Sequence, residues 1–221
     1  DRTICRECRE KECVTKHRTK GIRLSYEEME VDAVVEEVTA NRPMFYDGGG
    51  VTFTGGEATL QFDELLETLE RLHAAGIHTA LETNGASPRL KLCLPYIDQL
   101  IMDCKLCDDE KHRMATGISN KQTLENIRHA ARVHPCLHVR VPLIGEVNDS
   151  EADIKDFLEF FQTIGGDNVT FEILAYHAFG KKKWEQCGWE YQMPETAHVK
   201  EETTQHFMEK IVELGLNYMR T

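Results

Sequence analysis

The chain has 221 residues, enough for one large domain or two small ones, and its apolar content of 41% is ordinary for a globular protein. Its formal net charge of −12 argues against a nucleic-acid-binding surface, because phosphate contacts need clustered Lys and Arg. A local basic pocket at Lys181, Lys182 and Lys183 remains compatible with that charge. No apolar run is long enough to span a bilayer, so we expect a cytoplasmic protein with neither nucleic acid nor a membrane as partner.

The eight cysteines are unevenly distributed. Cys5, Cys8 and Cys13 are crowded at the start, and the other five are scattered over the rest of the chain. In a cytosolic protein such cysteines indicate free thiols or metal ligands rather than a disulfide framework. The chain begins with Asp rather than Met, which suggests a fragment of a longer protein.

Residues 1–24 are polar and show no helical or strand periodicity, which predicts a loop or the remnant of an insert, whereas residues 25–221 form the main domain. Ser25 followed by Glu28 is a capping-box pattern and predicts a helix that runs to about Asn41. The apolar face of this helix follows the helical period. It consists of Val31, Val34, Val35 and Val38.

From Gly50 onward, short apolar or β-branched segments alternate with helical patterns, and this repeated alternation predicts parallel βα units. A doubly wound open sheet and a TIM-like barrel both fit the pattern, and periodicity does not choose between them. About six strands are predicted, at Val51–Thr54, His78–Glu82, Gln99–Asp103, Leu137–Leu143, Asn168–Leu174 and Leu216–Arg220. A further helix is predicted to begin at Ser87-Pro88. The other helical patterns are centred on Leu65–Leu72, Leu124–Ala131, Ile154–Phe161 and Phe207–Leu214.

A polar or glycine-rich cluster follows nearly every predicted strand. In parallel α/β folds the carboxyl ends of the strands converge on one face, and that face holds the active site. Each cluster alone could be ordinary turn chemistry, but five together, with charges inside apolar strand ends, predict a shared site. The clusters are Gly55-Gly56-Glu57, Glu82-Thr83-Asn84-Gly85, Asp103 with Lys105, Arg140, and Tyr176-His177.

These clusters together suit the α-amino-acid end of a ligand. Gly55-Gly56 leaves the backbone open to close approach, and Glu57 beside it could accept from a ligand amine. Glu82 and Asp103 would be repulsive neighbours unless a cation or a positive ligand lies between them. Lys105 is a natural partner for a ligand carboxylate.

The stretch after the fifth strand carries His177, which is as readily structural or solvated as it is a site residue. Trp184, Trp189 and Tyr191 follow in a basic, aromatic segment. We interpret these aromatic residues as surface packing, with partner binding as the alternative.

These segments resemble the glycyl radical enzyme activating enzymes, the radical SAM group that includes pyruvate formate-lyase activating enzyme. The resemblance covers about residue 25 to the end, with the motifs in the right order. It implies a partial (βα)6 TIM-like barrel of parallel strands in which the first strand and the cluster loop are missing. The matching stretches are Gly48–Glu57, Gly76–Gly85, Leu94–Asp98, Asp103-Cys104-Lys105, Arg140–Ile144, Tyr176-His177 and Gly180-Lys181.

The resemblance implies a binding site for S-adenosylmethionine. Gly55, Gly56 and Glu57 would form the loop that meets the methionyl amine. Lys105 would meet the carboxylate of the same ligand.

The resemblance also implies a monovalent cation beside that carboxylate, held by Glu82, Thr83 and Asp103. Arg140 and His177 would lie near the ribose and the adenine.

The sequence departs from the family at its iron–sulfur cluster. Family members bind a [4Fe–4S] cluster through a C-x3-C-x2-C loop, and no such spacing occurs here, so we expect its ligands in missing N-terminal residues and no catalytic residue in this chain. Cys5, Cys8 and Cys13 lie where a ferredoxin-like insert of the family would end. They could be ligands of an auxiliary [4Fe–4S] cluster completed from elsewhere, a zinc site with His17, or unliganded thiols.

The activity implied is reductive cleavage of S-adenosylmethionine by a reduced cluster, after which a hydrogen atom is taken from a glycine of a partner glycyl radical enzyme. An electron donor such as flavodoxin would supply the electron. The fragment itself is expected to be inactive for lack of cluster ligands. Two alternatives stay open: a non-catalytic module that binds a ligand or partner on the same barrel, and another radical SAM activity such as activation of anaerobic ribonucleotide reductase.

Overall fold

The computed structural model describes residue 13 and residues 26–220. Within that part of the chain a single sheet has five parallel strands in the sequential order β1-β2-β3-β4-β5. Each strand lies within one residue of its prediction. The strands are β1 Gly50–Phe53, β2 His78–Thr83, β3 Gln99–Asp103, β4 Leu137–Leu143 and β5 Val169–Ala175.

The sixth predicted strand, Leu216–Arg220, is wrong. This segment makes only an isolated parallel bridge between Tyr218 and Phe171. The side-chain amide of Asn217 donates to the backbone carbonyl of Val169 at 3.2 Å. This bond occupies a carbonyl of β5 that a sixth strand would need as an acceptor. The described residues therefore form a five-stranded partial barrel.

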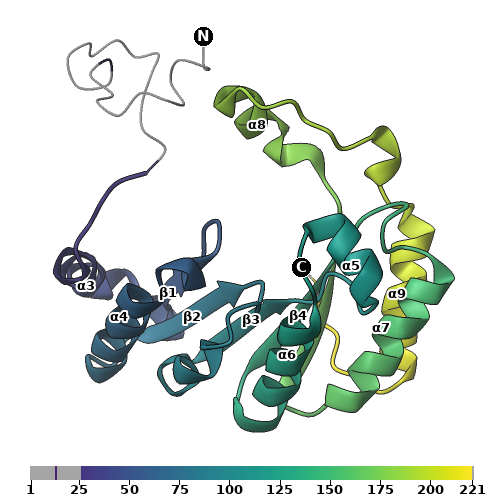
Figure 1. Ribbon diagram of the computed structural model, residues 1–221. Helices are drawn as coiled ribbons and strands as arrows, with labels where there is room; N and C mark the ends of the chain where they lie inside the picture. The colour runs from purple at the N-terminus through teal and green to yellow at the C-terminus, as the bar shows by residue number, and fades with distance from the viewer. Residues whose placement is uncertain (1–12, 14–25, 221) are drawn as a thin grey trace.

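The helices follow the strands in the expected alternation, as Figure 1 shows. The α7 helix begins at the Ser150 cap, whose hydroxyl accepts from the backbone of Asp153 at 3.2 Å, and the same cap type, from Asp108, starts α5. None of the described helices is long and apolar enough to cross a membrane. The bounds are α3 Val31–Ala40, α4 Phe62–Ala74, α5 Asp109–Thr116, α6 Lys121–Val133, α7 Glu151–Ile164, α8 Lys181–Cys187 and α9 Glu201–Glu213.

Two helix predictions need correction. Ser25 lies outside the described residues, and the first described helix, α3, begins only at Val31, because residues 26–30 are not helical. Ser87-Pro88 does not open an α-helix but leads into two short 3-10 turns, Leu90–Leu92 and Leu94–Tyr96. Pro95 lies in the second turn, and its missing N–H prevents the two turns from merging into one helix.

The two faces of the sheet differ in chemistry. Alternate residues of a strand point to opposite faces, and the register aligns Leu81, Leu100, Leu137 and Val169 in one row on the outer face. These side chains are buried against α4, α6, α7 and α9, which lie along the outside of the curved sheet in Figure 1. Among the described residues no such layer of helices covers the inner face, and the segment with α8 lies across from it (Figure 1).

Candidate functional site

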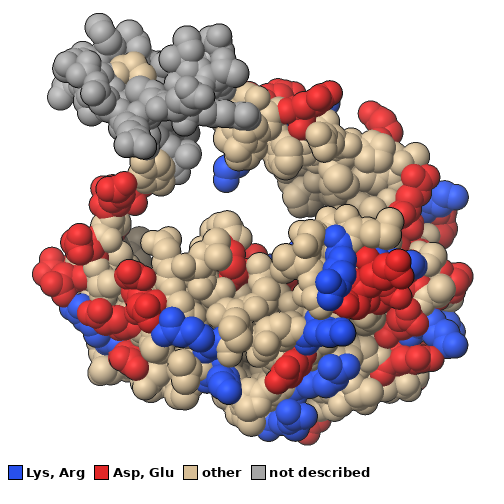
Figure 2. Space-filling model, viewed as in Figure 1, with Lys and Arg blue, Asp and Glu red and all other residues tan. Residues whose placement is uncertain are grey.

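The site lies on the inner face, toward the carboxyl ends of the strands. One row of the sheet aligns Glu82, Ile101 and His138 on β2, β3 and β4. The next row aligns Asp103 of β3, Arg140 of β4 and Glu172 of β5. Charged side chains from four neighbouring strands thus share one face of a sheet whose other face is apolar. Figure 2 shows that the molecule is hollowed between the sheet and the segment that carries α8.

An ion-pair cluster forms the centre of this face. The Nη2 atom of Arg140 lies 2.5 Å from Oε1 of Glu82 and 3.4 Å from Oδ1 of Asp103. The other carboxylate oxygen of Asp103 accepts from Nζ of Lys105 at 2.6 Å. Burial alone would lower the pKa of the Arg140 guanidinium, but the two carboxylates outweigh burial and raise that pKa above its ordinary value. The guanidinium therefore stays charged.

The loop after β1 carries Gly55, Gly56 and Glu57. Gly55 has φ of +126°, which only glycine adopts readily, and a Cβ added at Gly55 or Gly56 would meet no atom within 4 Å. The loop backbone is therefore open to the approach of a ligand.

Glu57 has internal partners. Its Oε1 accepts from the hydroxyls of Thr59 and Thr83, at 2.6 and 2.7 Å, and its Oε2 accepts from the backbone N–H of Asn84 at 2.8 Å. The Glu57 carboxylate thus joins the loop after β1 to the end of β2. A ligand amine would have to share an acceptor that already has these donors.

Thr83 lies apart from the two carboxylates with which the resemblance grouped it. Its Cα is in register with Met102, on the outer face, and its hydroxyl bonds to Glu57. Glu82, one residue earlier, points to the inner face beside Arg140. The structure brings Glu82 and Asp103 together but leaves the Thr83 hydroxyl on the opposite side of β2.

The Lys105 loop is held by a residue that sequence reasoning missed. Asn148, with 1% of its surface exposed, donates its amide to the carbonyls of Lys105 and Pro142, each at 2.8 Å. Its Oδ1 accepts from the backbone of Ile144 at 2.7 Å. Asn148 therefore ties the loop after β3 to the end of β4, which keeps Lys105 beside Asp103. Nothing in its local sequence distinguishes it from a turn asparagine.

His138 and Glu172 were also missed. Both are buried on the inner face, and Nε2 of His138 lies 3.2 Å from Oε2 of Glu172, without the geometry of a hydrogen bond. Burial lowers the pKa of His138; nearby Glu172 opposes that effect, and Arg140 adds to it. The signals in the sequence were that His138 lies two residues before Arg140, on the same side of β4, and that Glu172 is a charged residue within the apolar β5 segment.

His177 follows β5 at the same edge of the sheet, but its ring packs on Phe179, with centroids 4.2 Å apart. The Trp184 ring contacts those of Trp189 and Tyr191, at centroid distances of 5.6 and 5.9 Å. Tyr191 in turn hydrogen-bonds through its hydroxyl to that of Tyr176. These aromatic contacts fasten the α8 segment to the end of β5.

The predicted auxiliary cluster cannot be placed. Cys5 and Cys8 lie outside the described residues, and Cys13 is exposed. In the part of the chain that the structure describes, no three His, Cys, Asp or Glu side chains gather as a metal site.

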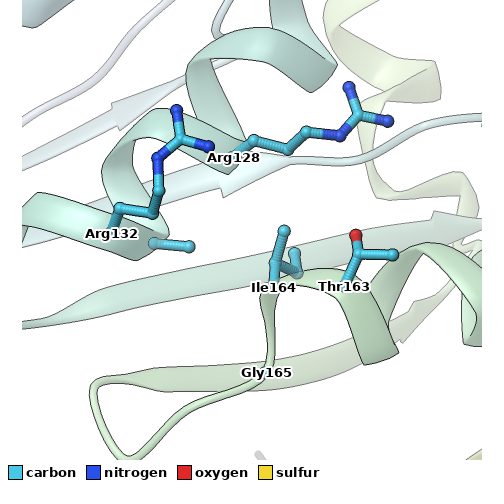
Figure 3. A pocket seen from close by; sticks show the side chains of 6 residues that line it. Arg128, Arg132, Thr163, Ile164 and Gly165 are labelled. Carbon is cyan, nitrogen blue, oxygen red and sulfur yellow. The ribbon is translucent and has the colours of Figure 1, made fainter.

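A separate pocket of about 270 Å³ lies between α6 and α7. Figure 3 shows Arg128 and Arg132 on α6, with Thr163, Ile164 and Gly165 at the end of α7. The ends of these helices lead into the starts of β4 and β5, so this pocket lies at the opposite end of the strands from the charged cluster.

Comparison with known proteins agrees with the architecture. Residues 11–160 match the Radical SAM superfamily. A domain of pyruvate-formate lyase-activating enzyme from Bacteroides vulgatus ATCC 8482 is similar, with a TM-score of 0.63 and 27% identity over 77% of this chain and 97% of that one. Streptococcus suis SuiB bound to S-adenosylmethionine shares the fold alone, with a TM-score of 0.60 and 12% identity over 89% of this chain and 44% of that one.

Curated relatives narrow the family. The 4-hydroxyphenylacetate decarboxylase activating enzyme of Clostridioides difficile (strain CD196) is 32% identical over 98% of this chain and 69% of its own length. The choline trimethylamine-lyase activating enzyme of Oleidesulfovibrio alaskensis is 33% identical over 75% of this chain and 55% of its own. The chain is a radical SAM protein and belongs to the glycyl radical enzyme activating enzymes.

Proposed function

We propose that this chain forms the S-adenosylmethionine-binding barrel of an enzyme that installs a glycyl radical on a partner enzyme by reductive cleavage of that cofactor. The observation that carries the proposal is the charged cluster of Glu82, Asp103, Lys105 and Arg140, gathered from β2, β3 and β4 at one end of the sheet. The relatives that activate decarboxylases and lyases support a glycyl radical enzyme as the protein partner. A small electron-transfer protein such as flavodoxin would be the donor.

The residues present fit the amino-acid end of S-adenosylmethionine. Lys105 uses one of its three N–H donors on Asp103, and its side chain is 36% exposed, so it can also donate to a ligand carboxylate. The open backbone at Gly55 and Gly56 offers groups for the ligand amine. The buried Nε of Arg140 has no hydrogen-bond partner among the described residues, which leaves a donor for a polar ligand atom.

When bound, the cofactor and a reduced cluster supply the one-electron chemistry that takes a hydrogen atom from a glycine Cα. The residues of this chain bind the cofactor and orient it. Asp103 holds the Lys105 ammonium in place, Asn148 fixes the loop beneath it, and Glu57 fixes the glycine loop opposite. His177, at the end of β5, is the proposed contact for the adenosine end.

The cysteines of this chain do not fit the catalytic cluster. No C-x3-C-x2-C occurs among the 221 residues, so none of these cysteines has the spacing of the cluster ligands. We propose that the ligands come from outside these residues and that the chain alone is inactive. After anaerobic reconstitution with iron and sulfide it should form no 5′-deoxyadenosine from S-adenosylmethionine; product formation would contradict this.

Calorimetry with S-adenosylmethionine tests the binding site. The chain should bind, and Lys105→Ala and Asp103→Ala should each weaken binding by about tenfold or more, equivalent to about 1.4 kcal/mol. Lys155→Ala is the matched control, because Lys155 is an exposed lysine on α7 that pairs with exposed Glu159, away from the charged cluster. Equal affinities for all four proteins would remove the charged cluster from the binding site.

A further inference from the structure

We propose that the guanidinium of Arg140 takes the place of the monovalent cation between Glu82 and Asp103, so that cofactor binding by this chain does not depend on Na⁺ or K⁺. The inference rests on the proposed function, because it concerns the same site. It departs from the cation site that the family resemblance implies for Glu82, Thr83 and Asp103.

The first observation is the position of one nitrogen atom. Nη2 of Arg140 lies 2.5 Å from Glu82 and 3.4 Å from Asp103, so a positive charge already bridges the two carboxylates. A cation between them would have to displace that nitrogen. The Asp103–Arg140 register fixes the two backbones side by side, and the Arg140 side chain is only 17% exposed, which limits the room for the guanidinium to move away.

The second observation is that the implied ligand set does not converge. The hydroxyl of Thr83 lies on the outer face and is bonded to Glu57 and to the backbone N–H of Gly85, at 2.7 and 3.1 Å. Of the three implied residues, only Glu82 and Asp103 therefore present side-chain oxygens to the position that Arg140 occupies. Two carboxylates that already have a charged partner are a poor site for a weakly bound cation.

The pairing of charges around Arg140 also supports its role in place of a cation. Glu82 and Asp103 each already have a positive partner, because Arg140 contacts both carboxylates and Lys105 pairs with Asp103. Glu172, next to Arg140 in the same row, adds a third carboxylate to this face. Arg140 is thus a positioning residue that holds the carboxylates and, through Asp103, the orientation of Lys105.

The first test measures affinity for S-adenosylmethionine in KCl, NaCl and choline chloride at equal ionic strength. The unaltered chain should show the same Kd within about twofold in the three salts. Arg140→Met should bind about tenfold more weakly in choline chloride and recover severalfold in KCl or NaCl, because a small cation can then enter between the freed carboxylates. A purely structural role for Arg140 would give no such rescue by salt.

The second test needs no ligand, so its failure is separable from failure of the proposed function. The thermal unfolding midpoint of the unaltered chain should be the same in the three salts, whereas that of Arg140→Met should rise in KCl or NaCl relative to choline chloride. Arg113→Met, which removes an exposed Arg–Asp pair on α5, is the matched control and should show no difference between salts. A midpoint or Kd of the unaltered chain that improves specifically with Na⁺ or K⁺ would overturn the proposal, as would an Arg140→Met protein without cation rescue.

Discussion

The two faces of the sheet are built from alternate residues of the same strands, yet they serve different purposes. On β4 the outer residues Val139 and Val141 are fully buried against helices, whereas the inner residues His138 and Arg140 lie beside the carboxylates of Glu172 and Glu82. The outer face holds the fold together through apolar burial, and the inner face holds ionisable groups that the fold positions. Changes on the outer face should therefore reduce stability, and changes on the inner face should alter binding and pH dependence.

The largest expected effect is on the outer face. Phe171 is fully buried and stacks on Phe161, with centroids 4.3 Å apart. Phe171→Ala should lower the free energy of unfolding by about 3–5 kcal/mol, because it leaves a cavity in the core. Ile101→Ala, on the partly exposed inner face, should cost less than about 2 kcal/mol in the same denaturant titration. Equal costs would contradict the distinction between the faces.

A smaller loss of stability is expected from a change at Glu57, which joins the loop after β1 to the end of β2. Glu57→Gln replaces a carboxylate oxygen by an NH₂ group facing the backbone N–H of Asn84 or the threonine hydroxyls. Unfolding should become easier by about 1–3 kcal/mol, since charged acceptors with several donors are worth that much. Glu67→Gln, at an exposed helix position paired with Arg71, should change stability by less than about 0.5 kcal/mol.

A pH effect of modest size is expected from His138. Its pKa is lowered in the folded state by burial, so the unfolded chain binds more protons as the pH falls below about 6.5. The stability associated with neutral His138 is present above that pH and is lost on acidification. Glu172 and Arg140 face the ring and act in opposite directions on its charge. His138→Gln should flatten the slope of unfolding free energy between pH 6.5 and 5; an unchanged slope would show that His138 does not contribute.

The smallest effect concerns the cysteine thiols that are buried on the outer side of the sheet. It is a difference in chemical reactivity rather than in stability. Burial raises the pKa of Cys93 to about 11, and a contact with Cys107 together with burial raises that of Cys104 well above its ordinary value. At pH 8 both should resist iodoacetamide in the folded protein, because the thiolate is the reactive form. Exposed Cys13 and Cys136 should be alkylated before these two, as peptide mass spectrometry would show. Rapid labelling of Cys93 would mean that the outer face opens readily.

The sequence by itself determined the strands, the order of the site motifs and the family resemblance. Short apolar or β-branched segments between helical patterns located β3 and β4 to the residue. It also identified Glu82, Asp103, Lys105 and Arg140, because charges at the ends of such runs need partners. It failed at Leu216–Arg220, where the side-chain amide of Asn217 bonds to β5 in place of a backbone ladder. It also failed after Ser87-Pro88, where Pro95 separates two short turns.

Only the tertiary structure decided which side chains meet. Thr83 and Glu82 are neighbours in sequence but point to opposite faces, so one bonds to Glu57 and the other to Arg140. Strand register placed Arg140 beside Asp103 and brought Glu172 and His138 onto the same face of the sheet. The physical reason is that contacts between strands depend on register and on the pleat, which arise from packing of the whole sheet rather than from any one segment.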